Sequence, residues 1–160
     1  MEARAKILGH PIHQMLIVFP LGLLATSFFF DIGFLTLHKI SLALASYWMI
    51  AAGIIGGLAA AVFGLIDWLA IPAGTRAKRI GLWHGGGNVV VVVLFLASWW
   101  LRRAAHASPP MTAIVLSAAA VCIALVTGWL GGELVDRLGV GVHDGANLNA
   151  PSSLGGRRAV

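Results

Sequence analysis

The stretch HPIHQ at positions 10–14 stands directly before MLIVFPLGLLATSFFFDIGFLTL at positions 15–37, and this junction decides the fold. The second segment is an almost unbroken apolar run, and about 20 apolar residues suffice for an α-helix to cross a bilayer. His10 and His13 are three positions apart, so their imidazoles share one helical face. Pro11 fits the first helical turn, where its missing N–H costs no hydrogen bond. The junction therefore predicts a membrane span that begins with two histidines.

The composition places the whole chain in the membrane. Hydrophobic residues make up 59% of the 160 positions and charged residues only 11%, against about 45–50% and about 25% in soluble domains. The formal charge of +5 sits at the ends of apolar segments, which argues against nucleic acid as a partner and for the lipid bilayer. The lone Cys122 lies in an apolar run and supports no disulfide framework.

The apolar segments predict an all-α, up-down-up-down bundle of four transmembrane helices. The spans cover about 14–37, 43–69, 80–101 and 110–134, within one domain at 1–142, and the polar tail 143–160 is expected to be flexible. Pro20 predicts a kink in the first span. The small residues of the second span allow close helix contact, including contact with a second copy of the chain.

The basic residues predict the orientation. With four spans, both termini share a side with the loop at 71–79. That side holds eight basic residues and the other side three: Arg4, Lys6, Arg76, Lys78, Arg79, Arg137, Arg157 and Arg158, against Lys39, Arg102 and Arg103. The positive-inside rule therefore places both termini in the cytoplasm.

Ionisable side chains gather at one depth near this inner end, and every span contributes at least one. They are His10 and His13, Asp67, His84 and Glu133. Such groups are costly inside a membrane and are functional candidates by default. Helix bundles build cofactor sites from inward side chains of this kind.

The neighbours of His84 extend this candidate site. Asn88 is four positions after His84 and shares its face. The glycines at 85–87 are expensive in a helix, at roughly 1 kcal/mol each relative to alanine, so a flat macrocycle or a neighbouring helix is expected to approach them closely. At the outer end, Asp31 lies within the first span while His38 and His106 look like loop residues, and we predict no second site there.

The histidines leave two interpretations open. His13 and His84 either bind a metal or haem, or form hydrogen bonds with Asp67 or Glu133. His10 is a substitute ligand or an interfacial cap. Nothing in the sequence has the pattern of a hydrolytic enzyme, since no nucleophile triad, phosphate-binding loop or cysteine-based metal motif is present.

Several motifs, in their order and spacing, resemble the DUF2231 family of bacterial four-helix membrane proteins. The resemblance covers about Leu8–Val142 and is carried by HPIH (10–13), FPLG (19–22), DW (67–68), WHGGGN (83–88), GWLGGELV (128–135) and GVGV (139–142). It implies a multi-pass protein of the bacterial inner membrane. Relatives with attached Rieske-type or cytochrome c domains imply an electron-transfer setting, with a redox partner protein or a quinone as partner.

The chain departs from the family pattern at two positions. Gln14 stands where members often have proline, and Leu138 stands where many have histidine. If that histidine binds a cofactor in relatives, its role is missing here or is taken over by His143.

Three functional hypotheses follow. The first is a b-type haem protein of electron transfer, with His13 and His84 as axial ligands and Asn88 beside them. The second is a Zn, Cu or Fe site for transport or sensing, with mixed nitrogen and oxygen ligands from His10, His13, His84, Asp67 and Glu133. The third is an accessory subunit without a cofactor, in which the polar layer is hydrogen-bonded structure.

Overall fold

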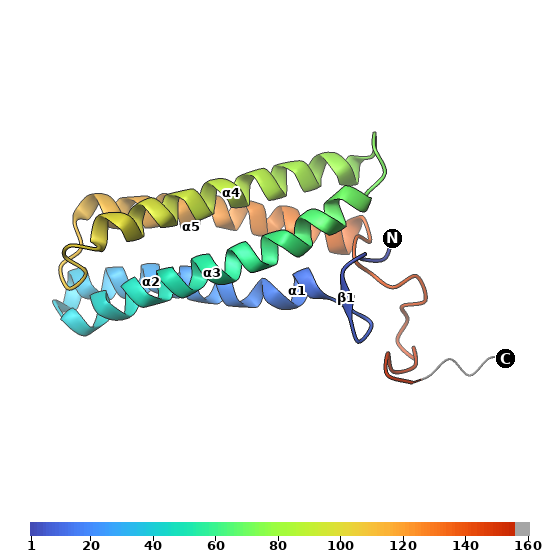
Figure 1. Ribbon diagram of the computed structural model, residues 1–160, viewed down its shortest axis with the longest axis horizontal. Coiled ribbons are helices and arrows are strands. Elements are labelled where there is room, and N and C mark those ends of the chain that lie inside the picture. Colours follow the sequence, from blue (N-terminus) through green and yellow to red (C-terminus); the bar gives the residue numbers. More distant parts are fainter. Residues whose placement is uncertain (156–160) are drawn as a thin grey trace.

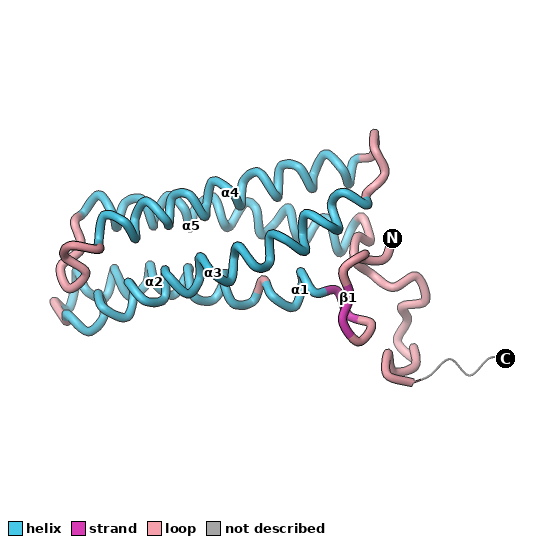
Figure 2. The backbone as a smooth tube through the Cα atoms, viewed as in Figure 1, coloured by secondary structure: helices cyan, strands magenta, loops and turns pink. Residues whose placement is uncertain are grey.

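Four long helices run antiparallel in the computed structural model (Figure 1), which describes residues 1–155. The first span consists of α1 (Ile12–Leu16) and α2 (Val18–Leu37), followed by α3 (Ile40–Ala70), α4 (Arg76–Arg102) and α5 (Met111–Gly132), which continues into a π-helical turn, η1 (Glu133–Arg137). A short antiparallel pair, β1 (Lys6–Ile7) and β2 (His10–Pro11), precedes α1. The amino group of Met1 donates to the Gly139 carbonyl, just after η1. The N-terminus and η1 therefore share one end of the bundle, which we call the inner end, and Figure 2 marks the N-terminus there.

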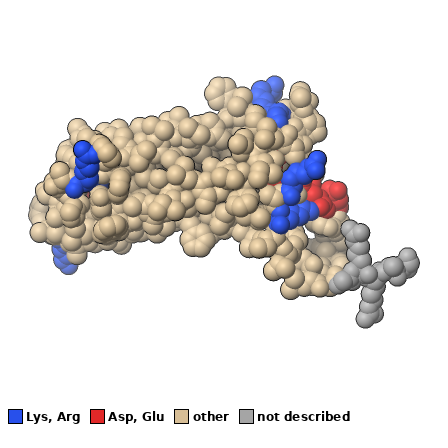
Figure 3. Space-filling view, in the orientation of Figure 1, with Lys and Arg blue, Asp and Glu red and all other residues tan. Residues whose placement is uncertain are grey.

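All four spans are long and apolar enough to cross a membrane. Apolar side chains are exposed along the flanks of the bundle, among them Phe29, Ile55, Val93 and Leu125. The visible Lys, Arg, Asp and Glu residues lie at the two ends, with an uncharged flank between them (Figure 3). This distribution is the one that a lipid environment requires, and it confirms the predicted four-helix membrane fold.

The first span is interrupted at Ile17, between α1 and α2. The interruption lies one turn before Pro20, whose ring lacks an N–H and collides with the carbonyl of residue 16 in a regular helix. The predicted kink near Pro20 therefore takes the form of this break. The short helix α1, which carries His13, packs against α3.

The glycines of α3 are used inside the chain. A Cβ at Gly53 would lie 2.6 Å from a methyl of Leu24. A Cβ at Gly57 would touch Pro20 and Val92, both at 3.6 Å. These glycines, which suggested contact with a second copy, let the first span and α4 pack closely against α3.

The centre of the bundle is apolar. Its core consists of Leu24, Ile50, Ile54, Val91, Phe95 and Ala120. Polar side chains occupy the inner and outer ends on either side of this core. The bundle is therefore two polar layers separated by an apolar one.

The two helical hairpins repeat one another. Every buried residue of α2 has a buried counterpart 71 positions later in α4: Leu24 with Phe95, Ser27 with Ser98 and Asp31 with Arg102. His13 and His84 are also 71 positions apart. Every buried residue of α5 has a buried counterpart 67 positions earlier in α3: Ser46 with Ala113, Tyr47 with Ile114, Ile50 with Ser117, Gly53 with Ala120 and Ala60 with Thr127. The halves therefore form parallel repeats about an axis along the bundle.

Candidate functional site: two imidazoles at the inner end

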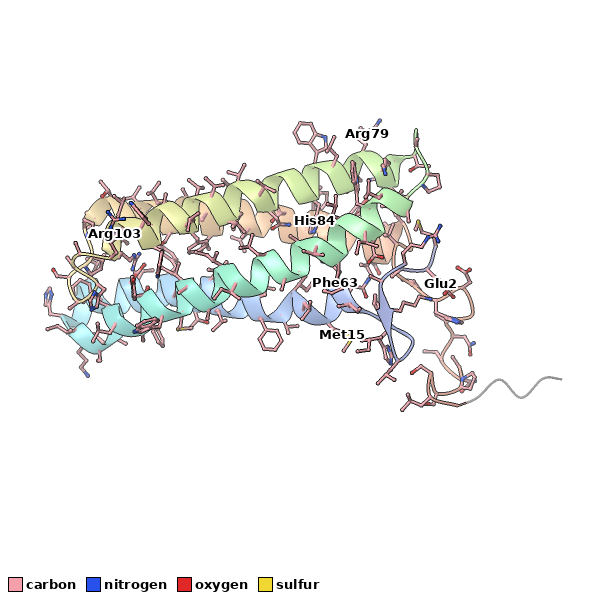
Figure 4. All side chains as sticks on the ribbon, viewed as in Figure 1. Glu2, Met15, Phe63, Arg79, His84 and Arg103 are labelled. Carbon is pink, nitrogen blue, oxygen red and sulfur yellow. The ribbon has the colours of Figure 1, made fainter. Side chains whose placement is uncertain are left out.

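His13 from α1 and His84 from α4 face one another across the bundle. Their ring centres are 6.3 Å apart and the ring planes are nearly perpendicular, at 88°. Both side chains are half-buried. Figure 4 shows His84 toward the end of the bundle that carries Glu2 and Arg79, away from Arg103. The structure thus brings together the two histidines that the sequence singled out.

Each imidazole is oriented by a main-chain carbonyl of a neighbouring helix. His13 Nδ1 lies 2.8 Å from the Ala60 carbonyl oxygen, and His84 Nδ1 lies 2.8 Å from the Thr127 carbonyl oxygen. A carbonyl oxygen only accepts hydrogen bonds, so Nδ1 carries the proton in both rings. In the neutral imidazoles, Nε2 then carries the lone pair. Histidine ligands of metals are held in this way.

Two glycines make room for the rings. A Cβ at Gly64 would lie 2.8 Å from both Cε1 and Nδ1 of His13, and a Cβ at Gly131 would lie 3.0 Å from Cε1 of His84. Each glycine is four residues after the carbonyl that its histidine contacts. The equivalence of the two hairpins therefore extends to the imidazole sites.

Asn88 and Thr127 complete the surroundings of His84. The Asn88 amide donates to the His84 carbonyl at 2.9 Å and approaches His84 Nε2 at 3.3 Å. Thr127 Oγ1 donates to Asn88 Oδ1 at 3.0 Å. Thr127 was not predicted, and its methyl group also explains one of the three consecutive glycines, because it packs against Gly87. Gly85 and Gly86 have open space beside them.

Thr127→Val should destabilise the protein by about 1–2 kcal/mol, because valine keeps the shape and leaves Asn88 Oδ1 without its donor. Thermal unfolding in detergent measures the effect. Thr36→Val is the matched control, since the Thr36 hydroxyl bonds its own helix at an exposed position. Equal stability of the two variants would contradict the role assigned to Thr127.

The other predicted site residues lie apart from the imidazole pair. Asp67 accepts hydrogen bonds from the main-chain N–H groups of Arg4 and Ala5, at 2.7 and 3.0 Å. Glu133 forms an ion pair with Arg76 at 2.6 Å. His10 is exposed on β2 and bonds Ser153 at 3.2 Å. Among residues 1–155, no three histidine, cysteine or carboxylate side chains form a group that could hold a metal ion. The hydrogen bonds expected from His13 or His84 to Asp67 or Glu133 are made to main-chain carbonyls instead.

The segment before β1 and the segment after η1 meet at the inner rim. Glu2 pairs with Lys6, accepts from the Asp144 N–H at 3.3 Å and lies 3.3 Å from His143 Nε2. The bonds from Lys6 and Asp144 lower the pKa of Glu2 below its usual value. Within the predicted tail, residues 143–155 form turns, and Arg157 and Arg158 lie outside the described residues. His143 therefore contributes to the rim, and its nearest charged partner is Glu2.

A second polar cluster, at the outer end, was not predicted. Arg102 donates from both terminal nitrogens to the two carboxylate oxygens of Asp31, each at 2.6 Å, and both side chains are fully buried. Ser98, Ser46 and Ser117 accept the remaining three guanidinium donors at 3.1–3.2 Å. Arg102, counted from the sequence among the basic residues of the outer side, does lie at that end, but it is buried inside the bundle. The sequence did carry one signal for the pair: both charges follow a histidine by 18 positions, Asp31 after His13 and Arg102 after His84.

These features define the class of the protein: a four-helix integral membrane protein with a buried ion pair at one end and an imidazole pair at the other. A comparison with protein families gives the particular family. The chain belongs to the family described as "Predicted membrane protein (DUF2231)", whose sequence model matches residues 9–144. No curated protein and no solved structure matches the chain.

Proposed function

We propose that this membrane protein binds one b-type haem through His13 and His84 and takes part in electron transfer. The observation that carries the proposal is the facing pair of imidazoles, 6.3 Å between ring centres. A metal bound between two imidazole nitrogens on opposite sides separates the ring centres by about 6 Å, because each metal–nitrogen bond is about 2.0–2.1 Å and each ring centre lies about 1 Å behind its nitrogen. Two imidazoles are also the axial set of many b-type haems. Haem, when bound, supplies one-electron chemistry.

The hydrogen bonds around the pair support ligation. Both Nδ1 atoms donate to main-chain carbonyls at 2.8 Å, so both rings present the Nε2 lone pair that a metal requires. Binding at His84 Nε2 would replace the 3.3 Å contact from Asn88, the longest hydrogen bond of the cluster. Gly64 and Gly131 have no side chains, so they leave room for the two rings.

The position of the pair supports a fixed site over a transport path. The apolar core, with Leu24, Ile54 and Phe95 at its centre, separates the imidazoles from the outer polar cluster. An ion crossing the bundle would lose all polar contact in this layer. A redox site near one face exchanges electrons there, with a quinone in the bilayer or a protein at the surface. The excess of basic residues at the inner end supports placing that face in the cytoplasm of a bacterial cell.

Alanine substitutions at each histidine test the proposal. After expression with a haem supply, His13→Ala and His84→Ala should each lose the low-spin haem absorption of the wild type, because iron loses one axial ligand. His10→Ala is the matched control and should retain the full spectrum, since His10 is exposed and bonds Ser153.

Three outcomes would overturn the haem assignment. An unchanged spectrum in His13→Ala or His84→Ala excludes that residue as a ligand. Stoichiometric Zn, Cu or Fe without porphyrin in the purified wild type would favour the non-haem site. Loss of stability in both variants with no cofactor in the wild type would favour an accessory subunit whose imidazoles serve as hydrogen-bonded structure.

A further inference from the structure

The two hairpins present nearly the same inner face to one another. Ser27 and Ser98 are equivalent and both fully buried, and Leu24 and Phe95 are equivalent core residues. The helix neighbours are equivalent too, since α3 packs against α4 and α5 packs against α2. Packing alone would therefore let a hairpin pair almost as well with a second copy of itself as with the other hairpin.

At one pair of equivalent positions the two hairpins carry side chains of opposite charge. Asp31 in the first hairpin corresponds to Arg102 in the second, and the two meet across the bundle with both carboxylate oxygens bonded at 2.6 Å. Neither side chain is exposed at all. The five guanidinium donors are fully used, by Asp31, Ser46, Ser98 and Ser117. This cluster has no donor left for a ligand, so its role lies in the pairing itself.

We propose that Asp31 and Arg102 decide which hairpins pair. The first hairpin, α1 to α3, accepts only a hairpin that carries a buried cation at the position of Arg102. Pairing of two first hairpins would bury two carboxylates against each other, and pairing of two second hairpins would bury two guanidinium groups. Unpaired buried charge is far more costly in a membrane than a satisfied ion pair. The opposite charges therefore hold a first hairpin to pairing with a second hairpin and exclude pairing of two like hairpins.

The first experiment exchanges the charges. Asp31→Arg and Arg102→Asp should each abolish recovery of folded protein from membranes, because each places like charges together. The double variant Asp31→Arg/Arg102→Asp should regain at least half of the wild-type yield. Arg76→Asp is the matched control at the exposed ion pair with Glu133, where the Arg76 side chain is 52% exposed, and it should fold with near wild-type yield.

The second experiment removes the charges and measures pairing directly. The variant carries Leu24→Cys in a Cys122→Ala background, so that it has a single cysteine. In the folded monomer, position 24 lies in the buried core. With Asp31 and Arg102 intact, oxidation should give monomer. When Asp31→Leu/Arg102→Met is added, two first hairpins can pair, the two cysteines meet, and the disulfide-linked dimer should rise at least fivefold.

Each experiment can overturn the proposal. Single reversals that fold as well as Arg76→Asp would show that like charges are tolerated. A double reversal that folds no better than the single reversals would show that complementarity is not what matters. A folded Asp31→Leu/Arg102→Met variant with no more cross-linked dimer than the charged background would show that the ion pair stabilises the bundle without selecting its partner.

Discussion

Arg102→Met is expected to destabilise the bundle by about 3–5 kcal/mol, the usual cost of removing one partner from a buried ion pair. The substitution leaves the Asp31 carboxylate fully buried with the Ser46 hydroxyl, at 2.6 Å, as its remaining donor. Chemical denaturation in detergent micelles measures the loss. Arg103→Met is the control, because Arg103 lies at the exposed rim over the Trp100 ring, a contact worth about 0.5–1 kcal/mol.

The double variant Asp31→Leu/Arg102→Met removes both charges. Its stability therefore separates the cost of one unpaired buried charge from the net contribution of the ion pair. Replacing a whole buried ion pair by apolar groups is often neutral or stabilising. The double variant should therefore be more stable than Arg102→Met by at least about 2 kcal/mol. A double variant less stable than Arg102→Met would contradict this account of the cluster.

Gly64→Val should expel the His13 ring from its position. A Cβ there would lie 2.8 Å from Cε1 and Nδ1 of His13, closer than real Cβ contacts allow. Overpacking costs about 1–3 kcal/mol, and loss of the bond to the Ala60 carbonyl adds about 1 kcal/mol. Thermal unfolding measures the destabilisation. If His13 holds haem as proposed, the haem content should fall as well.

Gly128→Val is the control for this substitution. Gly128 lies on α5 near the same end of the bundle and has open space beside it, so valine there should leave both stability and haem content near the wild type. If Gly64→Val behaves like Gly128→Val, His13 does not depend on the close approach of α3 and the site is held differently from our description.

The spans could be predicted from the sequence because membrane insertion depends on local composition. An apolar run of sufficient length must be helical in lipid, where every main-chain group needs an internal partner. The third predicted span, at 80–101, fell short of α4 by the turn that carries Arg76 and Lys78. That turn extends beyond the apolar run and is capped by Thr75, whose hydroxyl accepts from the Lys78 N–H.

The imidazole pair could be predicted by depth, while the carboxylates could not be placed. Position along a span gives the depth of a residue and leaves open the direction in which its side chain points. Asp67 is only three residues after Gly64, which packs on His13, yet it binds the main chain of Arg4 and Ala5. The location of that segment depends on the fold of residues before the first span.

The ion pair was missed because its partners are far apart in the sequence and its signal is a repeat. Asp31 alone resembles a stray polar residue, and Arg102 beside Arg103 resembles the end of a span. Aligning the two hairpins at an offset of 71 positions would have placed Asp31 opposite Arg102 on equivalent helices. Weak internal symmetry of this kind is common in membrane transporter folds, and it leaves little signal in any one segment.

The absorption spectrum of the purified wild-type protein, expressed with a haem supply and calibrated by extraction of the porphyrin, tests the central claim most directly. We predict a Soret band and one haem per chain, because in the proposed site the facing imidazoles of His13 and His84 would together hold one haem iron. A protein that is folded and pure but carries no Soret band and no extractable porphyrin would contradict the assignment of these imidazoles as haem ligands.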